Sequence, residues 1–102
     1  MSHSSRAFFE SLSQYCYVTK TPLLFHKNAV QHRHYLKGKL QAYEWIDALC
    51  LYYLKKEKNL KKEFLLLLHN HRYKIEAMSP STYRDGLLEA IDDIEKLIAS
   101  LE

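Results

Sequence analysis

Two His-x-His pairs are the residues of this chain whose types and spacing most readily suggest chemistry. His32 and His34 lie in QHRHY, and His69 and His71 lie in HNHRY. Such a pair shares one face of a β-strand and can bind a metal there, but on a helix its two side chains point about 160° apart. Because both pairs fall in helical patterns, we expect no metal site. His32 and His71 lie on apolar stripes, where we expect core or interface histidines.

The other candidate catalytic residues lack the arrangement that catalysis needs. Cys16 and Cys50 have no histidine nearby in the sequence, and the adjacent acids Asp92 and Asp93 point apart on a helix. The two glycines are isolated, so no glycine-rich loop can cradle a phosphate. No histidine follows an arginine at the spacing of five to seven residues that small helical ribonucleases often use. The sequence therefore predicts a protein that is not an enzyme and holds no cofactor.

The two cysteines and the start of the chain bear on the compartment. Two cysteines do not make the disulfide framework of a small secreted domain. The opening MSHSSRAFFESLSQ lacks the layout of a signal peptide, and no apolar run approaches ~18 residues. We expect a cytoplasmic protein with reduced thiols and no membrane partner. A disulfide between Cys16 and Cys50 is the alternative.

Basic residues dominate the first three quarters of the chain, whereas acidic residues outnumber basic ones in residues 79–102. The two parts can attract each other within one chain or between two copies. The basic segments 26–39 and 55–62 also suggest an alternative function, nucleic-acid binding driven by phosphate contacts. Its candidate residues are Lys27, Arg33, Lys37, Lys39, Lys55, Lys56, Lys58, Lys61 and Lys62. A solvated turn around KKEKNLKKE is the simpler interpretation, because lysine and glutamate alternate there and no helix carries a dense arginine face.

Apolar residues at steps of three and four predict the elements that must position these side chains. We expect four helices, at about residues 5–17, 22–57, 60–78 and 80–101. Pro22 and Pro80 suit the first turns of the second and fourth helices, with Thr21 and Ser79 as their caps. Asn28 is a competing start for the second helix. The turn near residues 57–60 rests on Asn59 alone, so one unbroken helix of about 50 residues is the alternative. The predicted fold is a single all-α domain, 1–102, resembling a four-helix bundle with one long central helix.

Both glycines occupy the same frame of a repeated pattern, Y-x-x-G-x-L-x-A-x-x-x-I, which begins at Tyr35 and at Tyr83. Glycine inside a helix costs roughly 0.5–1 kcal/mol relative to alanine. Gly38 with Ala42, and Gly86 with Ala90, place two small residues on one helix face and can let two backbones approach closely. Counting ~1.5 Å per residue, we expect the two glycines on parallel neighbouring helices, about 10 Å apart in height. A coincidence among common residues is the alternative.

The expected helix lengths leave the first half of the second helix poorly covered. The third and fourth helices are too short to reach it, so only the first helix can lie there. An exposed apolar stripe of this kind is typical of a partner surface, often for a second copy. We therefore predict a non-enzymatic protein-interaction module that forms a homodimer or binds another protein. The candidate contact residues are Phe8, Phe9, Leu12, Phe25, His32, Tyr35 and Leu36.

Overall fold

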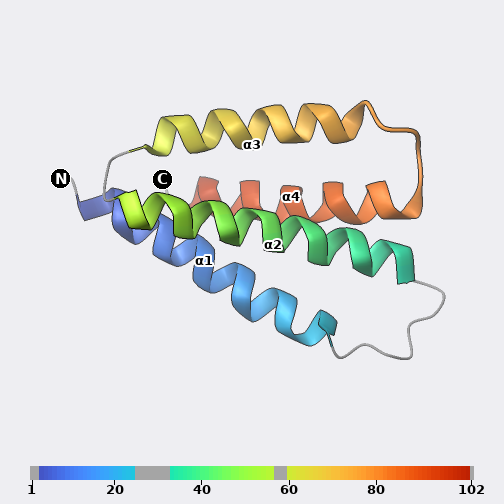
Figure 1. Ribbon diagram of the computed structural model, residues 1–102, viewed down its shortest axis with the longest axis horizontal. Coiled ribbons are helices and arrows are strands. Elements are labelled where there is room, and N and C mark those ends of the chain that lie inside the picture. The colour runs from blue at the N-terminus through green and yellow to red at the C-terminus, as the bar shows by residue number, and fades with distance from the viewer. Residues whose placement is uncertain (1–2, 25–32, 57–59, 102) are drawn as a thin grey trace.

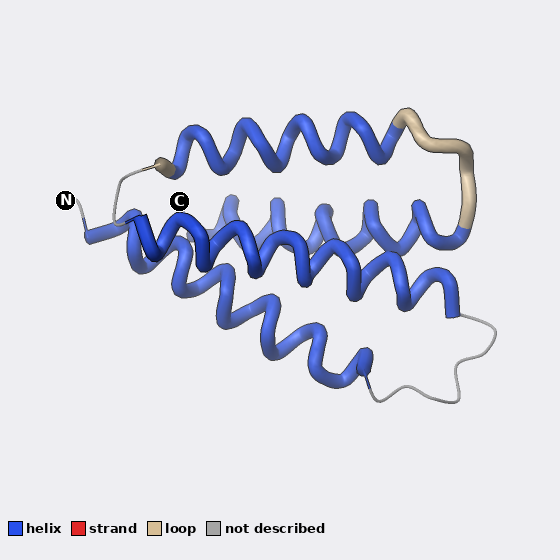
Figure 2. The backbone as a smooth tube through the Cα atoms, viewed as in Figure 1, coloured by secondary structure: helices blue, strands red, loops and turns tan. Residues whose placement is uncertain are grey.

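The computed structural model describes residues 3–24, 33–56 and 60–101, and these residues form four α-helices (Figure 1). The helices are α1 (His3–Leu24), α2 (Arg33–Lys56), α3 (Lys61–Glu76) and α4 (Thr82–Leu101). Consecutive helices run in opposite directions, so α2 and α4 are parallel neighbours (Figures 1 and 2). The predicted all-α, bundle-like fold is confirmed. The separate ends of α2 and α3 also exclude the alternative of one unbroken helix.

The boundary between the first two helices differs from the prediction. α1 continues to Leu24, past its predicted end at residue 17, and α2 begins at Arg33 rather than residue 22. Pro22 lies inside the last turns of α1. Its missing amide hydrogen leaves the carbonyl of Val18 without a helical donor, and Val18 is 56% exposed to water. On the other side of these turns Lys20 pairs with a carboxylate of α2, which favours the longer helix.

The start of α4 also differs in detail. Ser81, rather than Ser79, is the cap, because its hydroxyl oxygen accepts the amide hydrogen of Arg84 at 3.0 Å. The Arg84 side chain in turn donates to the carbonyl oxygens of Ile75 and Glu76, at 3.2 and 3.1 Å. These carbonyls belong to the last turn of α3, where a cation complements the helix dipole. One residue therefore joins the end of α3 to the beginning of α4.

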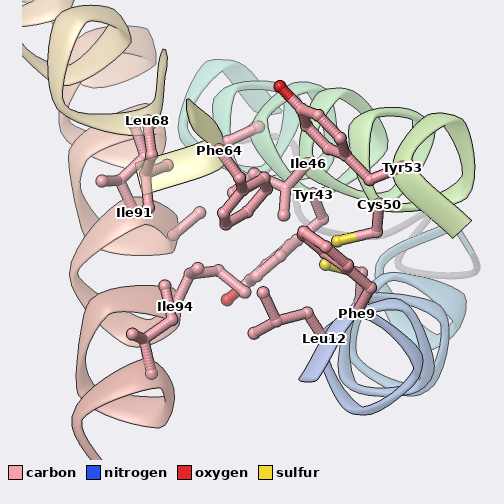
Figure 3. Packing of buried hydrophobic residues seen from close by; sticks show 14 of the residues in the cluster. Phe9, Leu12, Tyr43, Ile46, Cys50, Tyr53, Phe64, Leu68, Ile91 and Ile94 are labelled. Carbon is pink, nitrogen blue, oxygen red and sulfur yellow. The ribbon is translucent and has the colours of Figure 1, made fainter. Parts of the chain in front are cut away.

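The core gathers side chains from all four helices (Figure 3). Phe9 of α1 stacks on Tyr53 of α2 with ring centroids 5.2 Å apart, and both rings are nearly perpendicular to that of Phe64 of α3. Such aromatic pairs add to the free energy gained by burial. Aliphatic side chains such as Leu12, Ile46 and Ile91 are fully buried beside these rings. The largest fully buried side chains of the core are Tyr43, Tyr53, Phe9, Phe64, Leu12, Ile46, Ile91, Ile94, Cys16 and Cys50.

Gly38 and Gly86 lie at the place where α2 and α4 meet. A Cβ atom on Gly38 would overlap the carbonyl oxygen of Tyr83, and one on Gly86 would overlap the carbonyl oxygen of Tyr35. Each glycine therefore faces the backbone at the tyrosine of the other repeat. The replaced Cα hydrogens point at these oxygens, which makes a reciprocal pair of weak Cα–H···O contacts. The close approach inferred from the repeat is present in the structure.

The predicted height difference of about 10 Å between the two glycines is wrong. α3 ends at Glu76, and residues 77–81 then carry the chain further along α2 before α4 begins. This connection compensates for the shortness of α3. It brings the start of α4 level with the start of α2, so that the two repeats meet in register.

Candidate functional site

The residues of the predicted partner stripe do not share one environment in the structure. Phe8, Phe9 and Leu12 are at most 5% exposed and belong to the core, so they are not free to contact a partner. The prediction of an exposed stripe is wrong for these three because α1 runs antiparallel to α2. Its first half therefore covers the second half of α2, beside the start of α3.

The other members of the predicted stripe have different positions. Tyr35 and Leu36 are half-buried at the start of α2. Phe25 and His32 lie outside the described residues. The stripe therefore does not form one continuous exposed surface in the part of the chain that the structure describes.

An exposed apolar surface lies instead on the side of α2 that faces away from the core. Leu51 and Tyr52 are 53% and 51% exposed, and they line a shallow groove of about 810 Å³. The full lining is Arg6, Ala48, Leu51, Tyr52, Leu54 and Lys55, and we call this set the α2 groove. Residues 48, 51, 52 and 55 share a face at helical spacing, while the opposite face of α2 is buried in the core.

Cations surround the α2 groove. The Lys56 ammonium lies 5.3 Å from the centre of the Tyr52 ring, a cation–π geometry. No carboxylate among the described residues pairs with Lys55. Within the described residues Arg6 pairs with Glu10, at 3.3 Å, and both side chains are more than half exposed. The groove therefore has an apolar floor and a positive rim.

The predicted nucleic-acid residues do not form one surface. Arg33 and Lys37 begin α2, whereas Lys55 and Lys56 end it, a separation of roughly 30 Å along the helix. Lys39 is already paired with a carboxylate of α4 at 3.1 Å.

The remaining basic candidates lie at or near the start of α3. Lys61 sits with its ammonium 4.8 Å from the centre of the Phe8 ring, and Lys62 is exposed. Lys27 and Lys58 lie outside the described residues. The described candidates at the end of α2 and at the start of α3 therefore lie apart from those at the start of α2.

Several acidic residues of α4 pair within the chain. Arg72 of α3 donates to Asp92 at 2.6 Å and to Glu95 at 2.8 Å. Lys39 of α2 pairs with Glu89. A hydrogen bond from the Tyr35 hydroxyl, and then the Lys39 ammonium, lower the pKa of the Glu89 carboxyl. The attraction expected between the basic body and the acidic end is thus at least partly satisfied inside one chain.

Trp45 and His71 form the closest ring contact between α2 and α3. Their ring centroids are 3.9 Å apart and their planes differ by 14°. Burial, and then the charge of neighbouring Lys74, lower the pKa of His71. His69, the other member of the pair, is exposed on a different side of α3, as its spacing predicts.

The described core holds a buried tyrosine hydroxyl and two buried thiols. The Tyr43 hydroxyl donates to Asp93 at 2.9 Å, and burial raises the pKa of this tyrosine. Cys16 and Cys50 are free and buried, and burial raises the pKa of the Cys16 thiol to about 12. A thiol in this state is a poor nucleophile near neutral pH. The predicted disulfide alternative is not adopted in this structure.

Three comparisons with known proteins found no match for the chain. No protein-family model, no curated protein and no solved structure matches it. Within the residues that the structure describes, no three His, Cys, Asp or Glu side chains gather as a metal site would require. None of the described helices combines the length and apolar character needed to cross a membrane.

The sequence did not predict the α2 groove or the contact between Trp45 and His71. Leu51, Tyr52 and Trp45 lie off the stripe that periodicity selects for the core. The signal for Leu51 and Tyr52 was their position on the face opposite the buried residues of α2, with Lys55 one turn further along. No sequence signal identifies Trp45 as the partner of His71, because that contact depends on how α3 packs.

Proposed function

We propose that this protein is a non-enzymatic interaction module that binds a partner protein in the α2 groove. The observation that carries the proposal is the adjacency of Leu51 and Tyr52, two large apolar side chains that are each about half exposed inside a groove. Exposed apolar residues scattered singly are ordinary, but neighbouring ones with a polar rim are typical of interfaces.

The exposed apolar residues of α3 provide the contrast. Leu66 and Tyr73 are 59% and 71% exposed, but they lie two turns apart with exposed His69 and Asn70 between them. Neither residue lines a groove described here. Leu66 adjoins Leu67, which is 39% exposed, but none of these side chains lines the α2 groove, so Leu66 and Tyr73 serve as a control outside it.

The positive charge at the edge of the α2 groove indicates what kind of partner it would bind. The positive rim of Arg6, Lys55 and Lys56 favours a segment that carries apolar side chains flanked by aspartate or glutamate. An amphipathic acidic helix fits this description, and a groove between helices is a common way to bind one. A symmetric contact between two copies through this groove would bring like charges together, so the proposal favours a different protein over a second copy.

The test compares three baits in capture from the native host. The baits are the wild type, Leu51→Ser with Tyr52→Ser, and the control Leu66→Ser with Tyr73→Ser. We expect a protein captured by the wild type and the control but lost from the groove variant, because only that variant removes the apolar floor. Capture of that protein by the wild type should weaken with added salt, since the rim charges are exposed. Identical captured proteins from all three baits would contradict the proposal.

A further inference from the structure

A pocket of about 430 Å³ lies between α2, α3 and the first turns of α4. Its lining residues are Gln41, Trp45, His71, Lys74, Ile75, Met78, Tyr83 and Leu87. Ligand pockets of proteins fall in the range of about 300–1,000 Å³ and often lie between the helices of a bundle. The pocket shares no lining residue with the α2 groove, so it is a separate feature.

The walls of the pocket are mainly apolar. The stacked rings of Trp45 and His71 form one wall, and Ile75 and Leu87, both at most 5% exposed, join it to the core. Met78 is 39% exposed and supplies a flexible apolar side chain at the edge. This arrangement suits a small apolar or aromatic body.

The polar groups of the pocket favour an anion. Lys74 is exposed and is the one charged residue in the lining, which contains no aspartate or glutamate. The nearby carboxylate of Glu76 is engaged by Arg72 at 3.1 Å. Gln41 adds an amide that can donate a hydrogen bond. An apolar body with one carboxylate could therefore place its charge beside Lys74 and its body against the rings.

We propose that this pocket binds a small amphipathic organic anion, with Lys74 pairing its carboxylate and with Trp45, His71 and Met78 contacting its apolar part. The proposal is independent of the partner assigned to the α2 groove. Loss of one activity would leave the other unchanged.

The test is a titration with octanoate and with octanol, which share a chain and differ in charge. Trp45 is the only tryptophan, so its fluorescence reports directly on the pocket wall. We expect saturable changes with octanoate and about tenfold weaker binding of octanol, because a hydrogen bond to a charged group is lost. Amide chemical shifts should move at Lys74, Met78 and Tyr83.

Two variants assign the effect to Lys74. Lys74→Gln should reduce octanoate binding to the level of octanol and leave octanol binding unchanged. Lys62→Gln, an exposed lysine on the same helix but outside the pocket, should bind as the wild type does. Equal binding of octanoate and octanol, wild-type binding by Lys74→Gln, or no saturable change at Trp45 would each overturn the proposal.

Discussion

Gly38 and Gly86 show how a single missing side chain can set the distance between two helices. Besides the overlapping carbonyl oxygen, a Cβ on either glycine would meet a backbone amide nitrogen at 3.0 Å. Backbone atoms cannot rotate away as a flexible side chain can. The cost of glycine in the helix is thus offset by close packing between α2 and α4.

This packing predicts the sign of a mutation's effect. In an open helix, Gly→Ala stabilises by about 1 kcal/mol, because alanine has the higher helix propensity. We expect Gly38→Ala and Gly86→Ala each to lower the free energy of unfolding instead, by roughly 1–3 kcal/mol, through overpacking. Urea denaturation followed by circular dichroism measures this. Stabilisation by either substitution would show that the helices do not meet at that glycine.

His71 predicts how stability depends on pH. Its pKa is lowered in the folded state, mainly by burial and then by Lys74, so the unfolded chain binds the proton more readily. Stability should therefore be constant with respect to this group above its ordinary value of 6.5, and should fall as pH drops from there through the folded pKa. Denaturation at pH 7.5 and 5.0 measures the difference. His71→Gln should reduce it and the exposed control His69→Gln should not, whereas an unchanged dependence in His71→Gln would contradict the assignment.

The two cysteines predict slow thiol chemistry. Burial raises the pKa of both thiols, and the Cys16 value of about 12 leaves almost no thiolate near neutral pH. We expect a thiol reagent such as Ellman's reagent to react slowly with the folded protein and rapidly in urea. Rapid reaction of both thiols without denaturant would mean that Cys16 and Cys50 are accessible in solution.

At the scale of the elements, α3 is held differently from the other helices. Its buried residues are Phe64, Leu68 and Ile75, a narrow stripe compared with those of α2 and α4. Polar contacts add to this attachment, because Arg72 links α3 to Asp92 and Glu95 of α4. α3 should therefore be the helix most sensitive to loss of a surface charge.

Arg72→Met tests this attachment. Because the Arg72 side chain is only one quarter exposed and contacts several carboxylates, we expect a loss of about 1 kcal/mol, at the upper end for surface ion pairs. The loss should shrink in high salt. Amide hydrogen exchange should become faster in α3 before it does in α2. Exchange that rises equally in α2 and α3 would show that α3 does not open by itself.

Helix boundaries illustrate what the sequence could and could not predict. Periodicity identified four helices because each buries one face. It placed Pro22 at a helix start, although tertiary contacts such as that of Lys20 with Asp47 favour α1 continuing through it. The repeat around Gly38 and Gly86 predicted the close approach of two helices, whereas its register depended on a connection whose path the sequence does not show.

At the scale of the whole molecule, the exposed surface was the hardest part to predict. Apolar periodicity shows that a face is buried but not which helix covers it, so Phe8 and Phe9 were assigned to a partner rather than to the core. The α2 groove appears only when α1 and α2 are placed side by side. The pocket at Trp45 likewise forms only when α3 packs beside α2 and α4.

Charge also acts across the whole molecule. The basic body and the acidic α4 meet within one chain, through Lys39 with Glu89 and through Arg72 with Asp92. These pairs satisfy part of that attraction within one chain. The predicted homodimer stays a prediction, but the described core and these pairs favour a chain that folds alone.

Light scattering of the purified protein measures whether the chain is a monomer in solution. A core completed within one chain predicts the monomer mass of 12.1 kDa across the micromolar range, with the α2 groove left free for another protein. A concentration-independent mass of twice that value would contradict it and restore self-association as the function of the exposed surface.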